Sequence, residues 1–197
     1  MILYTGPTSP FGRMVRVVSL ELGTVLEERI VDVYTADFLD AINPLRQIPT
    51  LVTDDGEAVY DSRVICRYFD AVSGRPSLVP ERGRWGVETR WALAVGVMEA
   101  GLQRRMEIVR PDGEKSPAFV TRLQARIDRA IDRLEADSGQ IRDAGIRMDA
   151  LAVAVALEYT EFRYTADWRA RCPGLSAWLD EFARRPSMRQ TRPQDSR

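Results

Sequence analysis

The sequence predicts a two-domain chain, with an α/β domain at the N-terminus and an all-α helical bundle domain after it. Strand-like runs occur only in the first third of the chain, where they alternate with amphipathic helical patterns, and only helical periodicity follows. The stretch from Arg75 to Gly83 holds two prolines and is typical of a linker. We therefore expect a first domain over residues 1–76, a linker over residues 77–83 and an all-helical domain over residues 84–197.

The first domain is expected to combine a βαβ unit with a hairpin and a closing helix. A strand over residues 1–5 ends at Gly6-Pro7, and Ser9 is a favourable N-cap for a helix that ends at Gly23. Asp54-Asp55-Gly56 lies between two β-prone runs, which is typical of a hairpin. The other expected elements are a strand over residues 27–33, a short helical segment over residues 35–42 and a helix opened by Asp61-Ser62.

The second domain is expected to be a bundle of helices. The segment from Ala150 to Leu157 is apolar all round, so its helix should lie at the buried centre of the bundle. Asp149, near the start of that helix, can accept hydrogen bonds from its first backbone N–H groups. Helical patterns cover residues 84–107, 117–136, 149–164 and 174–184.

Composition excludes several classes of function. The formal net charge is -1, which disfavours nucleic acid as a partner, and no apolar stretch is long enough to span a bilayer. Histidine is absent, so hydrolase triads and most zinc sites are disfavoured and no metal site is expected. Cys66 and Cys172 are too few for a disulfide scaffold. We expect Cys66 to be buried in its helix, and Cys172, in a loop before Pro173, to be inert. The N-terminus lacks the pattern of a signal peptide, so we expect a cytoplasmic protein.

Ser9-Pro10-Phe11, followed by Arg16, combines a helix start with a hydroxyl group. A helix N-terminus with a hydroxyl donor favours a thiolate over a thiol, and the thiolate is the reactive nucleophile. The alternative is that Ser9 is an ordinary N-cap. Thr8 is the nearest competitor for the same role, and Tyr4, inside the expected strand, is a poorer one.

Two further segments offer groups that bind a peptide-like ligand. In Asn43 to Leu51 (NPLRQIPTL), a cis bond before Pro49 would expose backbone groups of Ile48, although the sequence alone favours a trans bond. Asp61-Ser62 begins a helix, where backbone N–H groups bind anions, and the alternative is again an ordinary cap.

In their order and spacing, these segments and Gly145 to Ala150 (GIRMDA) resemble the glutathione transferase family over essentially the whole chain. Trp178-Leu179, Phe182 and Arg185 to Met188 are also similar to the last helix of that family. The resemblance implies a thioredoxin-like first domain and a homodimer. It also implies glutathione as co-substrate, with no permanently bound cofactor.

The resemblance also implies roles for individual residues. In serine-type, bacterial-like cytosolic members, the residue matching Ser9 donates a hydrogen bond to the sulfur of glutathione. Ile48, before a cis Pro49, would pair its backbone with the cysteinyl part, and Gln47 would reach a carboxylate. Asp61 and Ser62 would hold the γ-glutamyl part, although Asp61 is one methylene shorter than the glutamate that is common there.

The activity implied is conjugation of glutathione to a hydrophobic electrophilic small molecule, as in detoxification. The alternatives are a glutathione-dependent isomerase or dehalogenase, and a non-catalytic binding or regulatory protein with the same fold. The electrophile is expected between the domains, near Phe11 and some of Arg104, Arg105, Met106, Arg110 and Tyr164. These arginines either polarise an anionic or halogenated substrate or form a solvated helix face.

Overall fold

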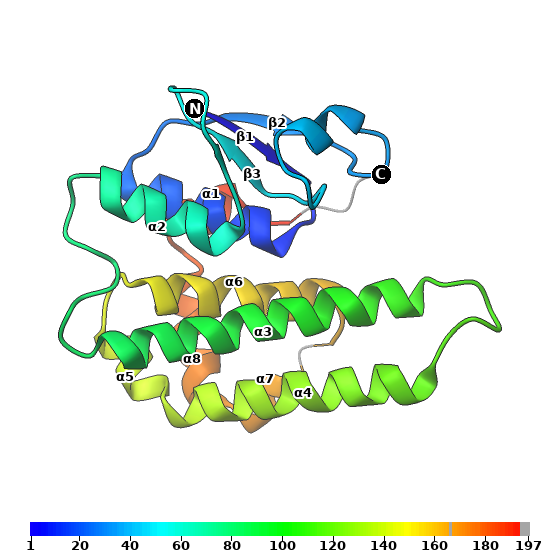
Figure 1. The fold of residues 1–197 in the computed structure, drawn as a ribbon. Coiled ribbons are helices and arrows are strands. Elements are labelled where there is room, and N and C mark those ends of the chain that lie inside the picture. The colour runs from blue at the N-terminus through cyan, green and yellow to red at the C-terminus, as the bar shows by residue number, and fades with distance from the viewer. Residues whose placement is uncertain (166, 194–197) are drawn as a thin grey trace. The chain divides into compact units, whose positions relative to one another are not determined.

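The structure, a computed structural model, describes residues 1–165 and 167–193 and divides into two units (Figure 1). The first comprises Met1–Leu78 and the segment that begins at Pro186, and the second comprises Val79–Arg185. The short helix α9 (Pro186–Gln190) therefore belongs to the first unit, whereas the sequence analysis assigned it to the helical domain.

A buried arginine explains why α9 lies with the first unit. Nη2 of Arg13 donates to the carbonyl oxygen of Met188 at 3.2 Å, and its Nε donates to Oγ1 of Thr191 at 3.4 Å. Ser187 also donates to the carboxylate of Glu21. The sequence gives no local sign of these contacts, because the partners are 166 to 178 positions apart.

The first unit contains a four-stranded mixed sheet in the order β2-β1-β3-β4. Strand β1 pairs with β2 in parallel and with β3 in antiparallel, and β3 pairs with β4 in antiparallel. Helices α1 and α2 pack against each other beside the sheet (Figure 1). The predicted α/β domain is confirmed. Its elements are β1 (Ile2–Thr5), α1 (Pro10–Leu22), β2 (Glu27–Ile30), η1 (Asp37–Ala41), β3 (Thr50–Val52), β4 (Ala58–Val59) and α2 (Ser62–Val72).

Local sequence signals account for most of these elements. Ser9 caps α1, and Gly23 adopts the left-handed conformation, φ 74°, as the C-cap. Gly56, at φ 83°, closes the turn between β3 and β4 as the Asp-Gly signal predicted. The strand expected over residues 27–33 ends at Ile30, and the segment expected over residues 35–42 forms only the 3₁₀ helix η1.

The second unit is all-helical within the described residues. In Figure 1 its long helix α3 runs between α6 and α4, and α3 contacts both of them. Residues 148–157 of α6 are all buried, which confirms the predicted centre of the bundle. The shorter helices α5 and α7 were not predicted, because four to six residues are too few to show a helical period. The elements are α3 (Arg84–Ile108), α4 (Pro117–Ala136), α5 (Ser138–Asp143), α6 (Met148–Arg163), α7 (Trp168–Arg171) and α8 (Pro173–Phe182).

Asp149 does not cap α6 as the sequence analysis expected. Helix α6 begins after Arg147 with no side-chain cap, and the carboxylate of Asp149 instead lies 2.7 Å from Nε of Arg90 in α3. Asp149 is fully buried and Arg90 is 5% exposed. Arg90 also donates to Gln140 at 3.0 Å, so this buried cluster joins α3, α5 and α6. Burial accounts for the difference, because an ionised carboxylate away from water is costly unless it is paired and hydrogen-bonded.

Candidate functional site

The sheet topology places the three predicted segments at one edge. Since β1 and β4 are both antiparallel to β3, their carboxyl ends meet at the edge where β3 begins. Ser9 follows β1, the Ile48-Pro49 segment precedes β3, and Asp61-Ser62 follows β4. The predicted site residues of the first unit therefore gather at the edge from which α1 and α2 start (Figure 1).

Ser9 is the N-cap of α1, with φ −70° and ψ 118°. Its Oγ accepts a hydrogen bond from the backbone N–H of Gly12 at 3.1 Å. This bond uses a lone pair of the hydroxyl, so the O–H group can still donate to a ligand. The first turn of α1 contains no acidic residue, so no carboxylate there offsets the positive end of the helix dipole. The capping role and an anion-binding role are thus compatible.

Tyr4, the poorer candidate, points away from the start of α1. Its neighbour Thr5 lies against α1, because a Cβ atom on Gly12 would come 2.0 Å from Oγ1 of Thr5. Successive strand residues face opposite sides, so the Tyr4 ring lies on the other face, 5.2 Å from the ring of Phe38. Thr8 is half-buried in the loop and remains an alternative to Ser9.

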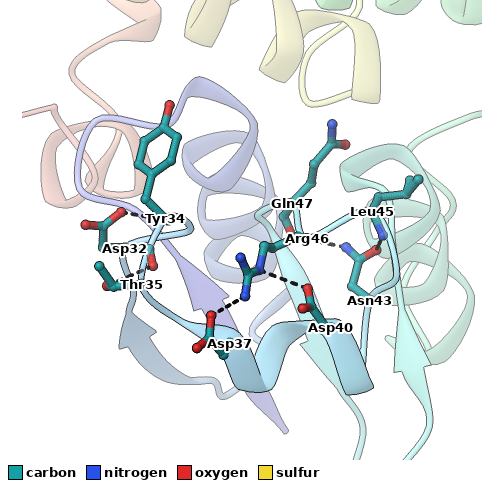
Figure 2. Close-up of polar contacts among 9 residues, drawn as sticks. All are labelled: Asp32, Tyr34, Thr35, Asp37, Asp40, Asn43, Leu45, Arg46 and Gln47. Atoms are coloured by element: carbon teal, nitrogen blue, oxygen red, sulfur yellow. Dashed lines mark hydrogen bonds and ion pairs between the residues drawn. The ribbon is translucent and has the colours of Figure 1, made fainter.

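The loop before β3 is organised by Asn43, which is 1% exposed. Its side-chain amide donates to the carbonyl of Gln47 at 3.0 Å and to Oγ1 of Thr50 at 2.9 Å (Figure 2). Its Oδ1 accepts from the N–H of Leu45 at 3.0 Å. The sequence analysis named Asn43 only as the first residue of the segment that leads to Pro49. The signal that it missed is the tendency of asparagine to bond the backbone of its own turn.

Arg46 connects the loop before β3 to the 3₁₀ helix η1. It adopts the left-handed conformation, φ 50°, and its guanidinium pairs with the carboxylates of Asp37 and Asp40 in η1, the latter at 2.9 Å. Figure 2 shows the Gln47 side chain extending away from these contacts. Gln47 is exposed, so its amide is accessible to a ligand.

The Ile48–Pro49 bond is cis, as the resemblance implied. The Tyr60–Asp61 bond is also cis. A Cβ atom on Gly6 would lie 2.9 Å from Cδ1 of Ile48 and 4.0 Å from Cβ of Ser9. Glycine at position 6 thus allows Ile48 to pack against the loop that carries Ser9.

Asp61 is the N-cap of α2. Its Oδ1 accepts from the N–H groups of Arg63 at 2.9 Å and Val64 at 3.3 Å, so the ordinary capping role is confirmed. The side chain remains 54% exposed, and the adjoining Ser62 is 4% exposed at the first position of the helix. The binding roles predicted for Asp61 and Ser62 remain predictions.

The residues expected to line an electrophile pocket belong to both units. Phe11 is half-buried in α1. In the helical unit, the guanidinium of Arg104 lies 4.0 Å from the ring centroid of Tyr164. Arg110 instead forms an ion pair with Glu107, at 3.5 Å between Nε and the carboxylate. The two remaining expected residues, Arg105 and Met106, are exposed in the last turns of α3.

Neither cysteine has the properties of a redox centre. Both thiols are free and fully buried. Burial raises the pKa of the Cys66 thiol well above its ordinary value, and burial likewise raises the pKa of Cys172 to about 11. Within residues 1–165 and 167–193, no group of three or more His, Cys, Asp and Glu side chains could hold a metal ion. Over the same residues, no helix has the length and apolar character to cross a membrane.

Comparison with known proteins identifies the family. Residues 8–72 match the family model of the glutathione S-transferase N-terminal domain. A GST-like protein of Escherichia coli K12, YibF, is 32% identical over 94% of this chain and 95% of its own length. A stringent starvation protein A homolog of Coxiella burnetii is 30% identical over 56% of this chain and 57% of its own length.

A solved structure extends the likeness to three dimensions. It is that of a glutathione transferase family member of Pseudomonas fluorescens Pf-5 with bound glutathione. The two chains are 34% identical with a TM-score of 0.94, over 98% of this chain and 99% of that one. The small mixed sheet is thus a thioredoxin-like domain joined to a helical one. From its sequence and its fold, the chain belongs to the glutathione transferase family.

Proposed function

We propose that this protein is a glutathione transferase that joins the sulfur of glutathione to a hydrophobic electrophilic small molecule, as in detoxification. The observation that carries the proposal is the hydroxyl of Ser9 at the start of α1, on the same sheet edge as Ile48-Pro49 and Asp61-Ser62. The glutathione bound to the Pseudomonas fluorescens relative supports glutathione as the co-substrate, with no permanently bound cofactor.

In this proposal Ser9 donates its O–H to the sulfur and stabilises the thiolate. The positive end of the α1 dipole adds to this effect. The thiol proton leaves to solvent, so the reaction needs no histidine. The thiolate donates an electron pair to an electrophilic carbon, and a C–S bond forms. With an aryl chloride, the C–Cl bond then breaks and chloride leaves with its electron pair.

The remaining predicted residues would hold the tripeptide. Ile48 would bind the cysteinyl part through its backbone N–H and C=O, and Pro49 would keep those groups exposed. Gln47 would reach a carboxylate, and its exposed amide supports this role. Asp61 and Ser62 would bind the γ-glutamyl ammonium and carboxylate at the start of α2. Phe11 and the ends of α3 and α6 would contact the electrophile.

The decisive variant is Ser9→Ala, with Ser116→Ala as a matched control. Ser116 also precedes a proline and caps a helix, accepting from the N–H of Phe119 at 3.3 Å. Both variants lose a cap worth about 1 kcal/mol. Only Ser9→Ala loses a hydrogen bond to a charged sulfur, worth about 1.5–3 kcal/mol, so kcat/KM for a generic aryl halide should fall roughly 10- to 150-fold.

Equal losses of activity in the two serine variants would remove Ser9 from the mechanism. If kcat/KM falls in Thr8→Val and not in Ser9→Ala, Thr8 has the role proposed for Ser9. Calorimetric titration of glutathione into the wild type and into Ser62→Ala tests the binding site itself. Binding should weaken in the variant.

The second candidate is a binding or regulatory protein without turnover. The likeness to a stringent starvation protein A homolog favours it, since that name specifies no glutathione chemistry. Absence of glutathione binding to the wild type would select this candidate. Glutathione binding without conjugation of any aryl or alkyl halide would point to an isomerase, and halide release without a stable conjugate to a dehalogenase.

We also propose a homodimer in the cytoplasm. The family resemblance supports the dimer, and two free thiols fit a reducing compartment. Sedimentation velocity tests the dimer, and a single species at monomer mass would contradict it.

A further inference from the structure

Two tyrosine rings are fixed against α3 near its carboxyl end. A Cβ atom on Gly101 would lie 3.0 Å from the ring of Tyr159 and 3.8 Å from that of Tyr164, so both rings lie close to the backbone of α3 at this glycine. The hydroxyl of Tyr164 donates to the carbonyl oxygen of Gly101. Tyr159 lies in the last turns of α6, and Tyr164 is the residue after that helix. Helix α6 lies beside α3 in Figure 1.

Arginine side chains stack on these rings. The guanidinium carbon of Arg104 lies 4.0 Å from the centroid of Tyr164. That of Arg163 lies 5.8 Å from the centroid of Tyr159 and 4.4 Å from that of Phe162. Stacking occupies the face of a guanidinium and leaves its N–H edge to bind a planar anion. In both arginines, Nε is buried without a hydrogen-bond partner among the described residues.

The positive charge of this cluster is not compensated by nearby carboxylates. Among the ion pairs of the described residues, none includes Arg104, Arg105 or Arg163. Burial raises the pKa of both tyrosines, so their hydroxyls carry no negative charge at neutral pH. Neighbouring carboxylates of α3 and α6 bind other arginines: Glu99 binds Arg126, Glu107 binds Arg110 and Glu161 binds Arg169.

We propose that Arg104 and Arg163 bind a carboxylate carried by the electrophilic co-substrate. A planar guanidinium edge matches a carboxylate through two parallel hydrogen bonds. The inference rests on the proposed conjugation and names the substrate class, which is an aryl or alkyl electrophile with a carboxylate substituent.

A matched pair of substrates tests the inference. We would measure kcat/KM for 4-chloro-3-nitrobenzoate and for 4-chloro-3-nitrobenzamide, in which the same chloride leaves but the carboxylate is replaced by a neutral amide. The ratio of the two values cancels any general damage to the enzyme. In Arg104→Gln and Arg163→Gln this ratio should fall about 10-fold or more, because a charge-assisted hydrogen bond is lost.

Arg122→Gln is the control variant. Its guanidinium also lies on an aromatic ring, 5.0 Å from the centroid of Phe119, but on α4 and outside the cluster. The substrate ratio should not change in this variant. A ratio that is unchanged in Arg104→Gln and Arg163→Gln as well would overturn the inference.

A binding measurement separates this inference from the proposed function. 3-Nitrobenzoate and 3-nitrobenzamide contain no leaving chloride, so calorimetry reports their binding whether or not the protein has turnover. Tighter binding of the benzoate, lost in Arg104→Gln, supports the anion site even if no substrate is conjugated. Equal binding of the two compounds to the wild type would mean that these arginines serve only the helix ends, and the site would be refuted.

Discussion

Replacing Asp149 by alanine should destabilise the helical unit more than any surface substitution. The change removes the carboxylate that lies 2.7 Å from Nε of Arg90 and 3.5 Å from Nε of Arg147. Since Arg90 is 5% exposed, its charge would stay buried without a carboxylate partner. Removal of one partner from such a pair costs about 3–5 kcal/mol. For a chain of this length, each kcal/mol lowers Tm by about 2–4 °C, so Tm should fall by roughly 6–20 °C.

Thermal unfolding followed by circular dichroism, together with urea unfolding, measures this effect. Asp143→Ala is the control, because Asp143 forms an exposed pair with Arg142 at 3.0 Å, and such pairs contribute at most about 1 kcal/mol. The double variant Arg90→Met with Asp149→Leu removes both charges and should recover most of the loss. The reasoning would be refuted if Asp149→Ala matched the control, or if the double variant were no more stable than Asp149→Ala.

Three further predictions concern the first unit and the two thiols. Gly12→Ala should lower Tm, because the new Cβ would lie 2.0 Å from Oγ1 of Thr5 and overpacking costs about 1–3 kcal/mol. Adding Thr5→Ala to this variant should restore part of the lost Tm. A Tm at or above that of the wild type in Gly12→Ala alone would contradict the prediction. Asn43→Ala should weaken glutathione binding in calorimetry, since the loop that presents Ile48 loses its buried donors; an unchanged Kd would show that the loop does not depend on them. At pH 7.5, neither Cys66 nor Cys172 should react rapidly with a disulfide reagent until guanidinium chloride unfolds the protein, because both thiols are buried. The shift in the pKa of Cys172 from 9.0 to about 11 also lowers its thiolate fraction about 100-fold. Fast labelling of the native protein would contradict this prediction.

The fold was predictable where the signal is local. The N-cap at Ser9, the left-handed Gly23 and the Asp-Gly turn each depend on a few neighbouring residues, and all three were found as predicted. Helix α6 was predictable because its apolar residues from Ala150 to Leu157 cover all sides of the helix, which indicates burial. The place of α9 was not, since it depends on Arg13, whose partners are more than 170 positions away.

The segments of the candidate site were identified in the sequence, and their roles in binding stay predictions; the contacts that hold these segments in place were not predicted. Ser9, Ile48 and Asp61 follow from short motifs, and the sheet topology gathers them at one edge. The buried amide of Asn43 and the left-handed Arg46 were missed, because both act through contacts that only the folded loop creates. The same holds for Asp149, whose partner Arg90 is 59 positions earlier in the chain.

The contact between Arg13 and the carbonyl of Met188 has a consequence for synthesis on the ribosome. The thioredoxin-like domain emerges first, yet the last partners of its buried guanidinium are translated only after the whole helical domain. Domains generally fold as units in the order in which they emerge. The first domain would therefore lack this hydrogen bond until the helical domain has been translated. Arg13 could gain its last partners only after translation has passed residue 188.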